Sequence, residues 1–156
     1  VPMIMNVNKI DAGQSFDYYM EGITPSIARM AEKVDAERIA LAKKLGIDVA
    51  STAQSVINGY GSHGENLYEV IQTTQAYVGI QSPSSLAHRF CHEDTFGSLV
   101  GFATLAKELG VPTPGMDAII TCISMATGID YFTVGRTAQK VGLTGKSVEE
   151  IYEMIR

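Results

Sequence analysis

Residues 24–46 read TPSIARMAEKVDAERIALAKKLG, and this stretch decides the fold class. Apolar residues recur along it at the spacing of one helix turn, which predicts a long amphipathic helix. Thr24 is a typical N-cap residue, Pro25 suits the first helical position, and Gly46 can end the helix. The pairs Asp35/Ile39 and Leu41/Leu45 suggest that this helix presents two faces to its neighbours.

The same periodicity continues through most of the chain. It predicts further helices over about 49–58, 66–78 and 97–109, one that starts at Thr113–Pro114, and one from Asp130 to about residue 140. Ser147 with Glu150 forms a capping box for a C-terminal helix. Residues 1–23 break the pattern and could be extended or irregular. We therefore expect an all-α fold of about eight helices in a single domain, residues 1–156.

Composition excludes several classes of protein. The 156 residues are 46% hydrophobic and 19% charged, with a formal net charge of −5 and no run of basic residues, so a nucleic-acid or anionic-membrane partner is not expected. The apolar stretches are too short to span a bilayer. Two widely spaced cysteines indicate free thiols in a reducing compartment. The glycine-rich segment NGYGSHGEN (58–66) follows no apolar strand and so does not meet the context of a phosphate-binding loop.

The segment HRFCHED (88–94) concentrates chemically active side chains. His88 and His92 would share one helix face, but a zinc site needs three or four converging ligands, and His63 is remote in sequence, so no metal site is predicted. Cys91 could act as a nucleophile beside a histidine, although a small buried cysteine is the more common role.

Arg89 and Asp94 allow two interpretations. On an unbroken α-helix, residues five apart differ by about 140°, so Arg89 would pair with Glu93 at the surface and Asp94 would cap the next helix. If the helix stops near Cys91, both side chains can turn into one cleft. There the guanidinium fork matches a carboxylate substrate, and an aspartate can orient a histidine.

The motifs of the whole chain resemble the C-terminal helical domain of the NAD(P)-dependent octopine/nopaline (opine) dehydrogenases. The resemblance rests on residues 88–120, followed by GID (128–130) and GRTAQKVGLTGKS (135–147), and on FDYYMEGITPSIARMAEKVDAERIALAKKLG (16–46). It covers nearly the entire chain, with the motifs in order.

The resemblance implies an NAD(P)H-dependent reductive condensation of an α-keto acid with an amino acid, between this domain and an N-terminal Rossmann domain that holds the cofactor and is absent from this chain. Arg89 would hold the keto-acid carboxylate, and Asp94 would be catalytic by orienting a histidine that acts as general acid and base. That histidine would lie just before Val1, in a phrase that ends VPMIMN. Asn6 belongs to the same phrase and would either line the cleft or cap a helix.

The sequence departs from the family pattern at two points, and it leaves other functions open. The family histidine is missing, and Phe96 stands where relatives often have proline. The isolated domain is expected to be inactive, and the enzyme to act in the cytoplasm, with a homodimer plausible. The alternatives are a reductase of the ketopantoate-reductase or glycerol-phosphate-dehydrogenase type and a non-catalytic helical dimerisation module.

Overall fold

Helix α3 (Pro25–Lys44) is the longest element of the computed structural model, which describes residues 1–154. Thr24 caps its start, because its Oγ1 accepts a hydrogen bond from the backbone N–H of Ile27 (3.4 Å). Gly46 ends it in the left-handed region (φ 75°), which allows Ile47 N to donate to Ala42 O at 2.9 Å. The predicted boundaries of this helix are confirmed.

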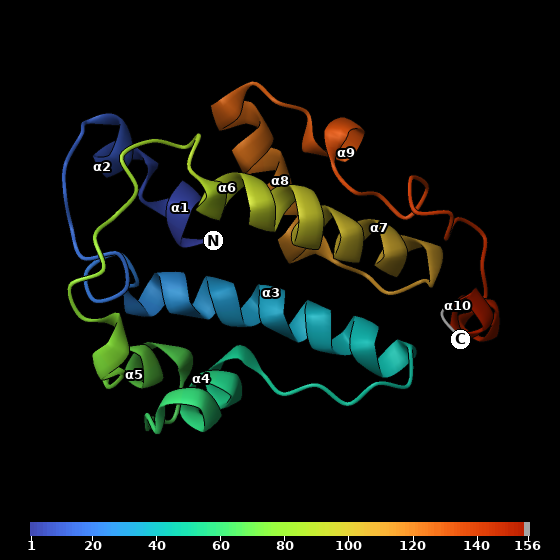
Figure 1. Cartoon of the computed structure of the whole chain (residues 1–156), viewed down its shortest axis with the longest axis horizontal. Coiled ribbons are helices and arrows are strands. Elements are labelled where there is room, and N and C mark those ends of the chain that lie inside the picture. The colour runs from blue at the N-terminus through green and yellow to red at the C-terminus, as the bar shows by residue number, and fades with distance from the viewer. Residues whose placement is uncertain (155–156) are drawn as a thin grey trace.

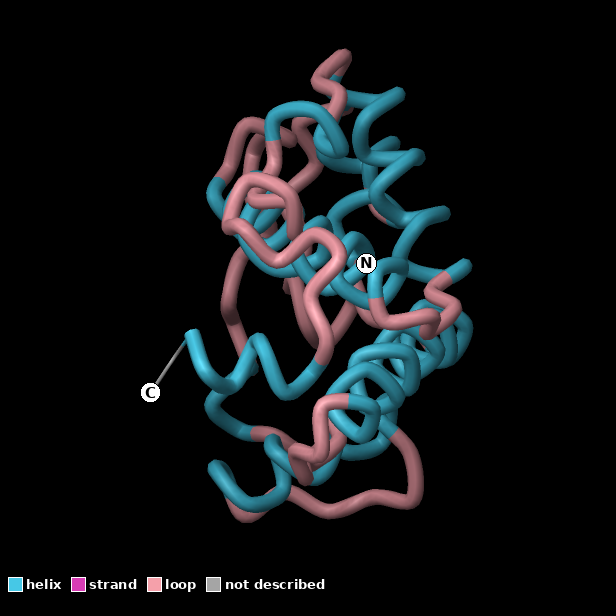
Figure 2. The backbone as a smooth tube through the Cα atoms, turned by 90° about the vertical axis from the view of Figure 1, so that its right-hand side faces the viewer, coloured by secondary structure: helices cyan, strands magenta, loops and turns pink. Residues whose placement is uncertain are grey.

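The remaining elements are short helices joined by loops, as Figure 2 shows from the side. They are α1 (Pro2–Met5), α2 (Val7–Asp11), α4 (Thr52–Tyr60), α5 (Leu67–Gln72), a 3-10 turn η1 (Gln75–Tyr77), α6 (Arg89–Glu93), a π-helical turn η2 (Asp94–Leu99), α7 (Val100–Glu108), α8 (Pro114–Thr127), α9 (Tyr131–Val134) and α10 (Val148–Met154). Within residues 1–154 there is no strand, only an isolated bridge between Asp17 and Gln81. The all-α prediction is confirmed, with ten α-helices in this part of the chain instead of about eight.

Helix α3 separates two hydrophobic clusters (Figure 1). The larger cluster joins α1, α2, α6, α7, α8 and α9, and includes the fully buried Val100, Met116 and Ile120. The smaller cluster joins the start of α3 to α4 and α5 around Leu67 and Ile71. Val34 of α3 packs on the first cluster and Ala28 lies in the second, so the predicted use of two faces is confirmed.

Three acidic side chains of α3 bind the N-terminal N–H groups of three other helices. Glu32 Oε1 accepts from Leu67 N of α5 (2.8 Å), and Asp35 Oδ2 accepts from Thr52 N of α4 (2.8 Å). The buried Glu37 accepts from both Gly115 N (2.7 Å) and Met116 N (2.8 Å) of α8. The first N–H groups of a helix have no partner within it, and a carboxylate there also interacts favourably with the helix dipole. Helix α3 thereby fixes where three helices begin.

Several predicted boundaries were wrong. The helix expected over 66–78 ends at Gln72, and the helix expected from Asp130 to about 140 is the short α9. Of residues 1–23, expected to be extended or irregular, residues 2–11 hold α1 and α2, while residues 12–23 are irregular. The helix expected to begin near Gly97 begins at Arg89, because the π-helical turn joins α6 directly to α7.

The π-helical turn is visible in the register of the buried residues. Cys91, Thr95, Val100, Ala103 and Ala106 are the buried positions of this segment. Their spacing is four, then five, then three and three, and the five-residue step crosses η2. A π-turn adds one residue to a helix turn, so both halves of the segment face the same core. The carbonyl of Phe96 accepts a hydrogen bond from Arg136 N (2.9 Å), which anchors the loop after α9 on this turn.

Candidate active site

Arg89 is the first residue of α6 and is exposed. His88 caps this helix, since its Nδ1 accepts from Phe90 N at 3.3 Å. The Arg89 guanidinium lies over the Phe90 ring, 5.6 Å from its centre. The ion pairs of residues 1–154, Arg38–Asp35 and Lys146–Glu150, do not include it. The guanidinium is therefore open to a partner from outside this chain.

Asp94 is the first residue of the π-helical turn, on the same continuous helical segment as Arg89. The helix does not stop near Cys91, which was the condition considered for a shared cleft; the change of helical type begins at Asp94 itself. Asp94 is exposed at the surface, but partial burial still raises the pKa of its carboxyl above the ordinary value; the negative charge of Glu93 adds to this and the positive charge of Arg89 opposes it. The Asp94 carboxylate therefore lies near the backbone nitrogen of Val1 as well as near Arg89.

Asn6 is buried, with 4% of its surface exposed. Its Nδ2 donates to Pro2 O (2.9 Å) and to Gly22 O (2.8 Å), which fastens the junction of α1 and α2 to the loop before α3. Its side chain makes no capping hydrogen bond to α2. The amide hydrogens of Asn6 are thus committed to backbone carbonyls within the domain.

Two other reactive side chains of the HRFCHED segment, Cys91 and His92, make their contacts within the protein. Cys91 is buried, and burial raises the pKa of its thiol, which disfavours the thiolate that a nucleophile needs. His92 Nδ1 forms a hydrogen bond with the hydroxyl of the buried Tyr131. Across residues 1–154, no group of three His, Cys, Asp or Glu side chains is arranged to hold a metal ion.

Aromatic rings extend the site in a way that the sequence interpretation missed. The ring of Phe90, next to Arg89, lies 5.5 Å from the ring of Tyr18, and Tyr18 contacts Tyr19 edge-on at 5.1 Å. The negative charge of Asp94 contributes, after burial, to the raised pKa values of Tyr18 and Tyr19. The aromatic residues of the segment SFDYYMEG were the available signal, but only the fold brings them to α6.

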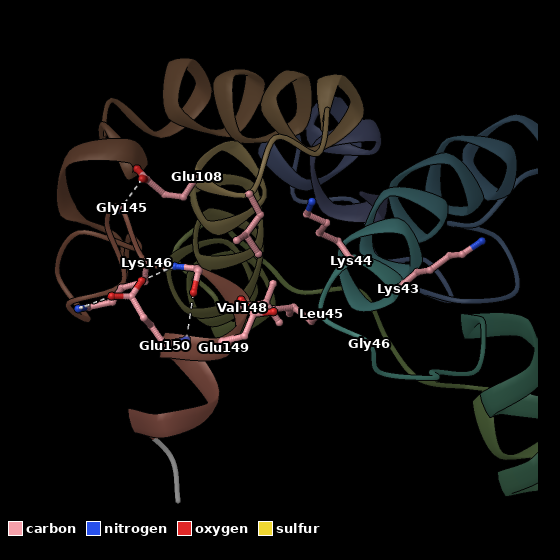
Figure 3. A pocket seen from close by; sticks show the side chains of 12 residues that line it. Lys43, Lys44, Leu45, Gly46, Glu108, Gly145, Lys146, Val148, Glu149 and Glu150 are labelled. Carbon is pink, nitrogen blue, oxygen red and sulfur yellow. Dashed lines mark hydrogen bonds and ion pairs between the residues drawn. The ribbon is translucent and has the colours of Figure 1, made fainter.

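A cavity shown in Figure 3 lies at the other end of α3 and is a separate feature. The ends of α3 and α7 and the start of α10 line it, with Lys43, Lys44 and Lys146 set against Glu108, Glu149 and Glu150. Glu108 accepts from Gly145 N at 2.9 Å, and Lys146 pairs with Glu150 at 3.8 Å. Its charges of opposite sign are interspersed, and neither Arg89 nor Asp94 lines it.

The sequence model of a known family, described as "NAD/NADP octopine/nopaline dehydrogenase, alpha-helical domain", matches residues 1–127. The chain belongs to this family. The recognised resemblance is confirmed, and it is favoured over the ketopantoate-reductase and glycerol-phosphate-dehydrogenase types.

Individual relatives agree with the family match. An opine dehydrogenase of Arthrobacter sp. (strain 1C) is 41% identical over 145 residues, which cover 93% of this chain and 40% of the relative. The protein ocs of Agrobacterium tumefaciens (strain Ach5) is 26% identical over 134 residues, 86% of this chain and 37% of that protein. A solved structure of octopine dehydrogenase with NADH and L-arginine has the same fold, with a TM-score of 0.68 at 21% identity, over 92% of this chain and 42% of that one.

The chain therefore spans about two fifths of the length of the relatives that it matches. Among the described residues, no helix is both long and apolar enough to cross a membrane.

Proposed function

We propose that this chain is the substrate-binding and catalytic helical domain of an opine dehydrogenase. In the reaction, the amino group of an amino acid adds to the carbonyl carbon of an α-keto acid, water leaves, and an imine forms. A hydride from NADH or NADPH, with a proton, then reduces the imine to a secondary amine. The family match over residues 1–127 is the observation that supports this most directly.

The cofactor does not fit the described part of this chain. The glycine-rich residues 58–66 connect α4 to α5, and no parallel sheet precedes them within residues 1–154. We therefore assign NAD or NADP to an N-terminal Rossmann domain of the whole protein. A homodimer and a cytoplasmic location belong to the same proposal.

Arg89 is proposed to bind the carboxylate of the keto acid. Its guanidinium is exposed, and a planar fork of donors matches a carboxylate in two parallel hydrogen bonds. Its place at the start of α6, with the ring of Phe90 beneath it, limits the directions that the side chain can take.

Asp94 is proposed to orient the histidine that the resemblance places just before Val1. The nearness of the Val1 nitrogen to Asp94 supports this, because a histidine that directly precedes Val1 would begin beside the carboxylate. A carboxylate in that position fixes the tautomer of an imidazole and stabilises its protonated form. Asn6 would support the site indirectly, by holding the α1–α2 junction in place.

The test uses the whole protein, assayed with pyruvate, an amino acid and NADH. Arg89→Ala should raise KM for the keto acid by roughly 10- to 100-fold, since a charge-assisted contact is lost. Asp94→Asn should lower kcat by at least about 100-fold and leave the KM values nearly unchanged.

Matched controls are Arg136→Ala and Asp48→Asn, which alter exposed side chains outside the site. Arg136 contacts the π-helical turn through its backbone N–H, which alanine retains. Wild-type kinetics for Arg89→Ala and Asp94→Asn would contradict the site assignment.

A further inference from the structure

The aromatic contacts that begin at Arg89 continue across the surface to α4. From Tyr19 the series passes to Tyr77 of η1, whose ring is stacked on that of Tyr19 at 4.1 Å with an interplanar angle of 15°. Tyr77 then meets Tyr60, the last residue of α4, at 5.3 Å. Residues of α6, of the loop before α3, of η1 and of α4 thus form one row of rings. Figure 1 shows the backbone of this region, where the segment after α5 runs to α6.

Phe90 is half-buried, and from the buried Tyr18 onward the rings become more exposed. Tyr18 is 6% exposed, Tyr19 and Tyr77 are half-buried, and Tyr60 is 56% exposed. Buried rings of this kind need no further partner, but a stacked tyrosine pair that ends in an exposed ring leaves apolar surface uncovered. We name Tyr19, Tyr77 and Tyr60 the tyrosine shelf.

The tyrosine shelf is uncharged. Burial, together with the neighbouring phenols of Tyr60 and Tyr19, raises the pKa of Tyr77 to about 12, and burial also raises the pKa of Tyr19. The carboxylate of Asp17, which lies nearby in sequence, already accepts from Tyr19 N (3.2 Å), Met20 N (3.0 Å) and Gly79 N (2.6 Å). These three backbone N–H groups fix the position of that carboxylate, and none of the three shelf residues supplies a carboxylate to pair with a cationic ligand.

We propose that the tyrosine shelf binds the side chain of the amino acid substrate and favours a large apolar or aromatic side chain over a small or cationic one. This inference rests on the proposed function, since the α-amino nitrogen of that substrate must add to a keto acid held close to Arg89 and Asp94. Beyond the buried Tyr18, the half-buried Tyr19 and Tyr77 and the exposed Tyr60 offer the side chain an apolar surface. Aromatic faces gain both from burial and from ring stacking.

The experiment compares alanine, phenylalanine and arginine as amino substrates of the whole protein, with pyruvate and NADH. The wild type should have the highest kcat/KM for phenylalanine. Tyr77→Ala should lower kcat/KM for phenylalanine by roughly 10- to 100-fold and for alanine by less than about threefold, because only the larger side chain reaches the shelf. Tyr77→Phe keeps the ring and should retain the wild-type preference.

Tyr68→Ala is the matched control, because Tyr68 packs on the smaller hydrophobic cluster but takes no part in the row of rings. It should lower stability and leave the ratio of kcat/KM for phenylalanine to kcat/KM for alanine unchanged. If Tyr77→Ala does not fold, Tyr60→Ala removes the exposed ring and should reduce the same ratio.

Three results would overturn the inference. An equal loss for alanine and phenylalanine in Tyr77→Ala would show a purely structural role, and a wild-type preference for arginine would contradict the proposed chemistry of the shelf. Both results leave the proposed function intact, because turnover still depends on Arg89. No turnover with any amino acid would overturn the proposed function itself and the shelf with it.

Discussion

Gly115 shows at the scale of one residue how closely α3 and α8 approach each other. A Cβ atom there would meet Glu37 Oε1 at 2.9 Å and Oε2 at 3.2 Å. Glu37 cannot move away cheaply, because both of its oxygens hold backbone N–H groups of α8 and the side chain is buried. The backbone φ of Gly115 is not in the left-handed region, so backbone conformation does not require glycine here. The close contact with Glu37 of α3 requires it instead.

Gly115→Ala should therefore lower the free energy of unfolding by about 1–3 kcal/mol. Gly59→Ala is the control: Gly59 lies in α4 with nothing within 4 Å of an added Cβ, so alanine should stabilise by up to about 1 kcal/mol. Urea unfolding followed by circular dichroism measures both. In a Glu37→Ala background the cost of Gly115→Ala should shrink, and an unchanged cost would contradict the proposed clash.

Asp17 makes stability depend on pH. Partial burial raises the pKa of its carboxyl, but the backbone N–H groups of Met20, Gly79 and Tyr19 outweigh this, so the net pKa lies below the ordinary value of 3.8. A pKa that is lower in the folded state stabilises this state fully when the pH is above the ordinary pKa. The stabilisation is lost as the pH falls through the pKa of the folded state.

The stability difference between wild type and Asp17→Asn should accordingly be largest near neutral pH and shrink below about pH 4. Urea midpoints of both proteins, measured from pH 6 to about pH 3, test this. Asp48→Asn, at an exposed position, should show no such convergence. A constant difference across this range would count against the three backbone hydrogen bonds.

Only some of these residue roles could be read from the sequence. The caps at Thr24 and at Ser147 with Glu150 were predicted because the donor and acceptor lie three residues apart, and both are present in the structure. The contact of Glu32 joins residues 35 positions apart, and the two contacts of Glu37 join residues 78 and 79 positions apart. No local pattern distinguishes such a carboxylate from a solvated one.

At the scale of elements, the π-helical turn lets one helix bury two stripes that would otherwise be out of register. The sequence signal exists as the five-residue step between Thr95 and Val100, but it is recognisable only once the buried residues are known. The regular periodicity on either side was therefore interpreted as a helix that starts near Gly97. Arg89 and Asp94 were singled out from their chemistry and from the family resemblance, and both lie on the helical segment that runs into this turn.

Deletion of Gly97 should convert the turn into a regular α-helix while Cys91, Thr95 and Val100 stay on one face. We expect helical content to be retained and the free energy of unfolding to change by less than about 2 kcal/mol, mainly through loss of the Arg136–Phe96 hydrogen bond. Deletion of Phe102 from α7 is the control. It should rotate the preceding buried residues by about 100° and unfold the domain. Equal damage by both deletions, measured by circular dichroism, would contradict this account of the turn.

At the scale of the whole molecule, the two hydrophobic clusters share α3 and should not unfold separately. Leu67→Ala in the smaller cluster and Ile120→Ala in the larger one remove buried side chains, 2% and 0% exposed. Each should lower the free energy of unfolding by about 2–5 kcal/mol in one common transition. The chain has seven tyrosines and no tryptophan, so tyrosine fluorescence can be compared with circular dichroism. Two separate transitions would show that α3 does not couple the clusters.

Helix α3 also has a consequence for how the polypeptide could be divided. The first turns of α4, α5 and α8 depend on carboxylates that all lie between Glu32 and Glu37. A cut in the connection between α3 and α4 would separate these acceptors from all three helix starts. The two fragments should each be poorly helical alone and should regain helix only when mixed, which makes the domain suited to a split-protein complementation assay.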